Sequence, residues 1–177
     1  MIGKSRLGKL LVEKEIIDKE TLDKALMIQA DEDPSNPRRL EEILTSDLRI
    51  DHDAIYGLLA DLYAFRTIDI DLDKLDQNQI KRTKEILSRF PEDFKRELLY
   101  NKVLPYRIAY GRKNTLIVLS ADPTNKIVEK IPLNTEFKKY EVVFCRLKII
   151  EELIETIAPQ KNEFLELLEE AGEQIEE

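Results

Sequence analysis

The sequence contains only one cysteine, Cys145, and only one histidine, His52. A single cysteine excludes an internal disulfide, which favours a reducing, cytoplasmic setting. The two residues are also too few for a zinc site, so no metal site is expected. Cys145 ends a run of apolar residues, and this position favours a place in the core over a role as nucleophile.

Long apolar runs and basic blocks are also missing. The start, residues 1–4, has no apolar stretch of the signal-peptide type, and no apolar run is long enough to cross a bilayer. We therefore expect no direct membrane insertion, and a partner would have to hold the protein at a membrane. The net charge is -8, with no dense Lys/Arg face, so nucleic acid is not an expected partner.

Two motifs with known chemistry are incomplete. Gly3-Lys4-Ser5 matches the end of a phosphate-binding P-loop, but the loop needs a preceding strand and an earlier glycine, for which there is no room. Asp69 and Asp71 alternate like the start of a calcium loop, but Lys74 stands where that loop requires glycine. We therefore expect neither ATP hydrolysis nor a calcium site, and the chain is not expected to be an enzyme.

The periodicity of the apolar residues changes near Tyr63. Before it, spacings of three and four predict short helices, one of them capped by Asp18. After it, alternation predicts strands over residues 66–72, 103–110, 115–119 and 141–145. Helical spacing predicts helices over residues 80–90, 125–131 and 147–157, and residues 111–114 suit a hairpin turn.

The expected fold class is therefore α+β. A helical N-terminal subdomain, residues 1–63, is followed by a small α/β subdomain, residues 64–158. Residues 159–177 are predicted to form an acidic amphipathic helix that links to a missing domain.

An internal repeat organises the helical part. At a constant offset, Arg6-Leu7 matches Arg39-Leu40, and the later apolar positions also match: Leu11 with Leu44, Ile17 with Ile50, Leu22 with Ile55 and Leu26 with Leu59. The repeat predicts two helix-turn-helix units with one shared core of Leu7, Leu11, Leu22, Leu26, Leu40, Leu44 and Leu59. A second core is expected from Ile68, Leu116, Val118, Val143 and Ile150. Leu26→Ala would then cost about 2–5 kcal/mol.

The first repeat contains a recognisable series of residues: Arg6-Leu7-Gly8, Leu11-Val12, Ile16-Ile17, Leu22, Ala25-Leu26 and Gln29. Through this series the chain resembles a known family, the N-terminal domain of the type II secretion and type IV pilus assembly ATPases (secretion protein E N-terminal and MshE N-terminal-like domains). Later segments follow in family order: residues 63–69, Phe90-Pro91-Glu92, Val103-Leu104-Pro105 and residues 116–123. The resemblance spans Arg6 to Ile157.

The resemblance implies a docking or regulatory domain whose partners are a membrane-platform protein and a downstream ATPase domain. Some family members bind cyclic di-GMP through two such repeats, so a sensor of this nucleotide is the first alternative, with no other cofactor expected. A generic helical scaffold is the second. The nucleotide-binding candidates are Arg6, Leu7, Gly8, Arg39 and Leu40.

A physical argument supports this choice of candidates. Each Arg-Leu pair is expected to open a helix, where free backbone N–H groups favour an anion. The first copy, however, has Glu15 where the family has glycine, and the second has Glu41, whose charge would oppose an anionic ligand.

Overall fold

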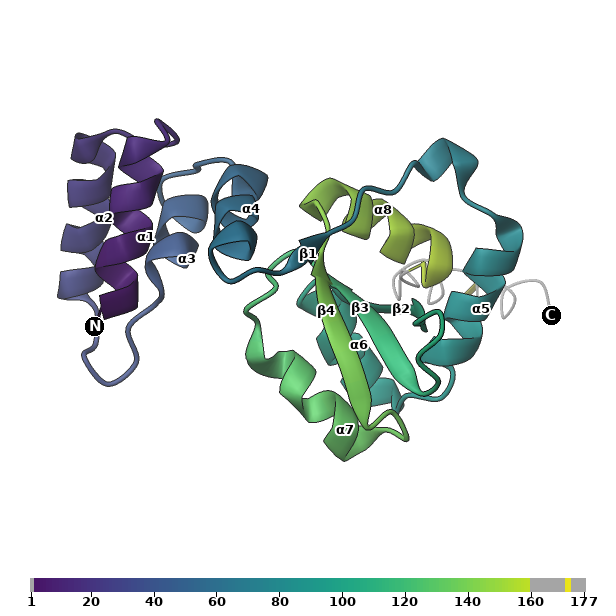
Figure 1. Cartoon of the computed structure of the whole chain (residues 1–177). Coiled ribbons are helices and arrows are strands. Elements are labelled where there is room, and N and C mark those ends of the chain that lie inside the picture. The colour runs from purple at the N-terminus through teal and green to yellow at the C-terminus, as the bar shows by residue number, and fades with distance from the viewer. Residues whose placement is uncertain (1, 160–170, 173–177) are drawn as a thin grey trace.

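The computed structural model describes residues 2–159 and 171–172 (Figure 1). It confirms the α+β fold class, with the helices first and a mixed sheet after them. Most of the predicted tail helix, residues 161–177, lies outside the described residues.

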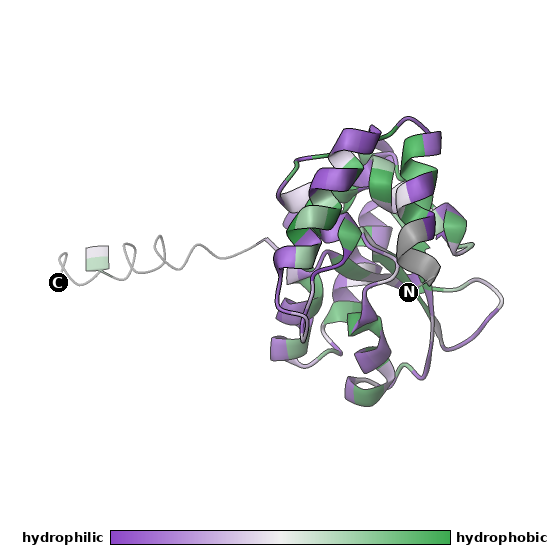
Figure 2. Ribbon diagram, turned by 90° about the vertical axis from the view of Figure 1, so that its left-hand side faces the viewer, coloured by the Kyte–Doolittle hydropathy of each residue, from purple (hydrophilic) through white to green (hydrophobic). Residues whose placement is uncertain are grey.

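Four helices form the first part of the chain: α1 (Ile2–Glu13), α2 (Lys19–Asp31), α3 (Leu40–Ser46) and α4 (His52–Leu62). Asp18 and Asp51 cap α2 and α4, since their carboxylates accept hydrogen bonds from the amides of Thr21 (2.7 Å) and Ala54 (2.9 Å). Figure 2 shows hydrophobic and hydrophilic residues alternating along these helices, as expected where one face is buried.

The core of the helical part agrees with the repeat except at one position. Leu7, Leu11, Leu40, Leu44 and Leu59 are buried together, and Leu22 is half-buried against them. Leu26 was expected in this core, but its side chain is 42% exposed. The small residue Ala25 holds the buried position on α2 instead.

The second part is a four-stranded sheet in the order β1-β4-β3-β2. Its strands are β1 (Arg66–Thr67), β2 (Val103–Ile108), β3 (Thr115–Ser120) and β4 (Lys139–Phe144). β2 and β3 form the predicted antiparallel hairpin, whereas β4 pairs in parallel with both β3 and β1.

Helices cover both faces of this sheet. They are α5 (Gln77–Leu87), α6 (Glu92–Tyr100), α7 (Ile131–Asn134), α8 (Leu147–Ile157) and the short 3-10 helices η1 (Leu72–Lys74) and η2 (Lys126–Lys130). Helix α6 was not expected. It begins after Pro91 and has two acids in its first turn, which is a recognisable start signal.

The prediction of one core around the sheet is wrong, because both faces of the sheet are buried and each has its own cluster. Ile117 and Leu119 of β3 face one cluster with Val143 and Ile150, against which Ile68 packs. Leu116 and Val118 point the other way, into a cluster with α6 and η2. Cys145 is fully buried in the first cluster, as predicted, and burial raises the pKa of its thiol to about 12.

The predicted strand over residues 66–72 is largely wrong, since β1 has two residues. Ile68 and Ile70 still pack against the core, but Ile68 makes only one backbone bond to the sheet, from its amide to the Phe144 carbonyl (2.9 Å). Their alternation therefore comes from packing of an extended chain and not from a full strand.

Candidate functional site

Three of the five predicted ligand residues are packed inside the helical core. Leu7 and Leu40 are buried, and Gly8 packs against side chains of Leu22 and Leu40. A Cβ on Gly8 would come within 2.8 Å of a methyl of Leu22 and 3.5 Å of a methyl of Leu40. The structure thus brings the starts of the two repeats together, and close packing alone explains the glycine.

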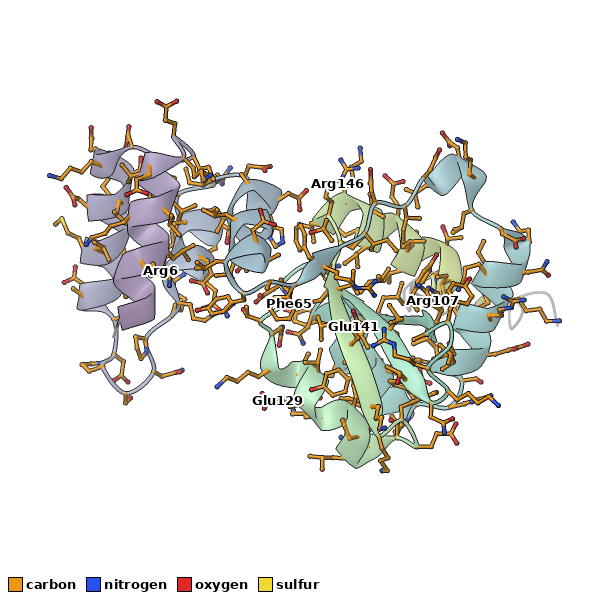
Figure 3. All side chains as sticks on the ribbon, in the orientation of Figure 1. Arg6, Phe65, Arg107, Glu129, Glu141 and Arg146 are labelled. Carbon is orange, nitrogen blue, oxygen red and sulfur yellow. The ribbon has the colours of Figure 1, made fainter. Side chains whose placement is uncertain are left out.

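Arg6 is exposed on α1 (Figure 3). The expectation that each Arg-Leu pair opens a helix is wrong for this copy, because α1 already begins at Ile2. No proline stands between Ile2 and Arg6, and the helix extends upstream through Gly3. The expectation is right for Arg39, which immediately precedes α3 and whose amide donates to the Glu42 carboxylate (2.9 Å).

The Arg39 side chain joins the two parts of the molecule. Its guanidinium pairs with the carboxylate of Asp122 and donates to the Thr124 hydroxyl at 2.6 Å. On its own side, its Nε lies 3.1 Å from a carboxylate oxygen of Glu41. Asp122 in turn accepts from the amide and hydroxyl of Thr124 (3.0 and 2.7 Å), so the loop after β3 is held in place.

This cluster holds one cation and three carboxylates, since Glu42 also lies 3.6 Å from Arg39 Nε. Partial burial alone would lower the pKa of Arg39, but Asp122 and Glu41 outweigh it and raise the pKa. Burial, followed by the charge of Asp122, likewise raises the pKa of Tyr56. Glu41 is itself buried beside Arg39. The carboxylates of Glu41 and Asp122 therefore compensate the charge of the guanidinium without a ligand.

Further contacts reinforce the seam between the helical part and the sheet. A ring nitrogen of His52 lies 3.0 Å from the Ala121 carbonyl oxygen, and the Asp53 carboxylate accepts from the Leu147 amide at 3.0 Å. Phe144, at the end of β4, belongs to the helical core and packs over Gly57. The two subdomains therefore share a core residue as well as polar contacts.

A pocket of about 650 Å³ opens along this seam. Its walls come from the end of α4 and the residues after it, the loop with η2, and β4. They are Arg39, Leu59, Tyr63, Phe65, Pro123, Thr124, Asn125, Lys126, Val128, Glu129, Tyr140 and Val142. No sequence pattern indicated this pocket, because its residues lie in segments that only the tertiary fold brings together.

Within residues 2–159 and 171–172, no group of three or more His, Cys, Asp or Glu residues is placed to hold a metal ion. The helices in these ranges include none that is both long and apolar enough to cross a membrane.

Comparisons with known proteins give the fold a context. No family model and no curated protein matches the sequence. Among solved structures, MshE with cdg (cyclic di-GMP) matches with a TM-score of 0.57 and 23% identity, over 85% of this chain and 95% of that one. The N-terminal domain of XpsE matches with a TM-score of 0.58 and 17% identity, over 85% and 92%. This chain therefore has the fold of the N-terminal domains of type II secretion and type IV pilus assembly ATPases.

Proposed function

We propose that this chain is an N-terminal docking and regulatory domain of a type II secretion or type IV pilus assembly ATPase. The observation that carries the proposal is the match over nearly the whole length of two such domains, 95% and 92% of their chains. The order of the sequence motifs from Arg6 to Ile157 supports it independently.

In this role the domain acts by protein–protein contact and not by catalysis. The sequence has no P-loop motif, and the proposed role assigns hydrolysis to an ATPase domain as its partner. The other partner is a platform protein at the inner membrane, which would recruit this cytoplasmic domain.

The test is binding to the cytoplasmic part of the platform protein from the same organism, by titration calorimetry. We expect micromolar affinity or better, and no MgATP turnover by the isolated chain. Absence of binding to platform proteins of both secretion and pilus systems would contradict the docking function.

A cyclic di-GMP sensor is the second candidate, favoured by the likeness to MshE with cdg and by the retained Arg6-Leu7-Gly8 motif. The contacts of Arg39 argue against the sensor function, because its guanidinium already binds Asp122, Glu41 and Thr124. Calorimetry with cyclic di-GMP decides between the two. Tight binding lost in the Arg6→Ala, Arg39→Ala double variant would favour the sensor, and weak or absent binding is the expected result.

A further inference from the structure

The two long sides of β4 are paired unequally. On one side β4 pairs with β3 along its whole length, from Lys139 to Phe144. On the other side β1 pairs only with Val143 and Phe144. The first four residues of β4, residues 139–142, thus have no strand neighbour on the β1 side among the described residues. They are exposed or half-buried, whereas β3 is buried throughout.

The backbone groups on this open side can be assigned from the hydrogen bonds near the end of β4. The Cys145 amide donates to Ser120 of β3, and the Phe144 carbonyl accepts from Ile68 on the β1 side. Since successive residues of a strand direct their peptide groups to alternate sides, Tyr140 and Val142 face the same side as Phe144. Their amides have no acceptor in the part of the chain that the structure describes.

The backbone after α4 places no strand along this part of β4, although the Arg66 guanidinium donates to the Glu141 carboxylate (2.6 Å). Ala64 has φ of 57°, in the left-handed region, and there the backbone turns from α4 into β1. The incoming chain therefore reaches the sheet only at Arg66, opposite Val143. Figure 1 shows β1 as a short strand at one end of β4.

The opposite edge of the sheet, along β2, is protected in a way that the β4 edge is not. Pro105 has no backbone N–H to donate to an added strand, and the register of β2 shifts beside it. The Tyr106 carbonyl accepts from the Thr83 hydroxyl (2.8 Å) and the Gln79 amide (3.2 Å) of α5. One edge is thus closed against pairing, and the other is open over half its length.

The open edge borders the seam pocket. Tyr140 and Val142 of β4 line it together with Phe65 and Tyr63, and Tyr63 is 56% exposed. The volume of about 650 Å³ lies within the range of about 300–1,000 Å³ for ligand sites.

The charges of the pocket disfavour an anionic occupant. The carboxylates around Arg39 outnumber this one cation, and Lys126 and Glu129 on η2 carry opposite charges. Figure 3 labels Phe65 near the junction of the subdomains and Glu129 beside the sheet.

We propose that an extended segment of a partner protein adds as a strand to residues 139–142 and places alternate apolar side chains in the seam pocket. In this mode of recognition, backbone hydrogen bonds supply affinity and pockets for alternate side chains supply specificity. The inference rests on the proposed docking function for the nature of the partner, and it assigns the surface that the partner uses.

The test uses a phage-displayed library of random dodecapeptides selected on the purified chain, followed by fluorescence anisotropy with the best synthetic peptide. The selected sequences should carry apolar residues at alternate positions. Addition of the peptide should slow hydrogen exchange of the Tyr140 and Val142 amides.

Two variants at one position separate backbone pairing from side-chain packing. Val142→Pro removes the edge amide and should weaken peptide binding about tenfold. Val142→Ala keeps the amide and should lose less. Tyr63→Ala should also weaken binding, whereas Tyr110→Ala, at an exposed position that does not line the pocket, should not. If Val142→Pro fails to fold, hydrogen exchange of the unaltered chain decides whether the peptide pairs with the backbone of β4.

Failure to select any binding peptide, or binding without protection of the two amides, would overturn the strand-addition site. The assay contains no secretion component, so its outcome is separate from that of the proposed function. A chain that captures peptides at this edge but no platform protein overturns the docking role in secretion alone. Binding of a platform protein without protection at Tyr140 and Val142 overturns only the edge site.

Discussion

Glu15 occupies a backbone position that suits glycine. Its φ is 57°, and the bonds from its amide to Val12 (3.0 Å) and from the Ile16 amide to Leu11 (2.9 Å) form the turn that ends α1. The family resemblance placed glycine here, and the left-handed backbone gives the physical reason. Glu15→Gly should therefore stabilise the chain by about 1 kcal/mol, measured as a rise in the urea midpoint.

Lys9→Gly is the matched control, because Lys9 is an exposed residue in the body of α1. That change should destabilise the chain by about 0.5–1 kcal/mol. Equal effects of the two substitutions would show that the left-handed turn is not strained by Glu15.

Asp47 links stability to pH. Hydrogen bonds from Arg38 (2.8 and 2.9 Å), and then from Ser46, lower the pKa of its carboxyl to about 2. A carboxyl whose pKa is lower in the folded state contributes stability above its ordinary pKa of about 4 and loses it as the pH falls. The contribution should thus be nearly complete at pH 5, be largely lost by pH 2, and vanish only below that pH.

The measurement is the urea midpoint of the unaltered chain and of Asp47→Asn between pH 5 and pH 2. The two curves should differ most at pH 5 and converge at the acidic end. Arg38→Gln should lose more stability at pH 5 than Asp47→Asn, since it also removes the bond from the Arg38 guanidinium to Glu32. A difference that stays constant with pH would contradict the assignment.

At the scale of elements, the repeat predicts helices better than it predicts their burial. Leu26 of α2 and Leu59 of α4 occupy matching positions, yet Leu59 is buried and Leu26 is 42% exposed. Helix α4 also faces the seam pocket and the shared residue Phe144, and α2 has no such neighbour among the described residues. Leu26→Ala should therefore cost under about 1 kcal/mol, whereas Leu44→Ala, in the core, should cost about 2–5 kcal/mol.

Chemical denaturation of both variants checks this prediction. If Leu26→Ala costs as much as Leu44→Ala, the exposed face of α2 must be covered in solution, which contradicts the arrangement described here.

The strands were predictable where packing and pairing coincide. The hairpin of β2 and β3 has both a turn at residues 111–114 and a strongly apolar pattern, and it was expected nearly as found. The segment after Tyr63 shows the limit. Ile68 and Ile70 alternate, but hydrogen bonding to β4 ends almost at once, and alternation alone cannot reveal this. The split of the second core into two clusters also depends on the parallel pairing of β4, which has no local signal.

At the scale of the whole molecule, the seam between the helical part and the sheet is the feature that the sequence patterns do not predict. Arg39 could be singled out from the repeat, but its partners Asp122 and Thr124 lie more than eighty residues away. Only the tertiary fold turns a candidate ligand-binding arginine into a structural link between two subdomains. The role of the five predicted residues in ligand binding stays a prediction, to be tested with cyclic di-GMP.

The seam also yields a prediction about stability. Arg39→Ala would leave the carboxylates of Asp122 and Glu41, which are 15% and 10% exposed, without their cation. The loss of a charged partner at a partly buried site should cost about 1–3 kcal/mol in urea denaturation. Arg96→Ala is the control, since that arginine is 74% exposed and its pair with Glu92 should be worth under about 1 kcal/mol.

A double-mutant cycle shows whether the cost arises at the seam. Asp122→Asn combined with Arg39→Ala should be less destabilising than the sum of the two single changes, because both remove the same ion pair. Additive effects would mean that Arg39 stabilises the helical part alone, through Glu41. In that case the shared residue Phe144 and the bonds of His52 and Asp53 would have to hold the two subdomains together without it.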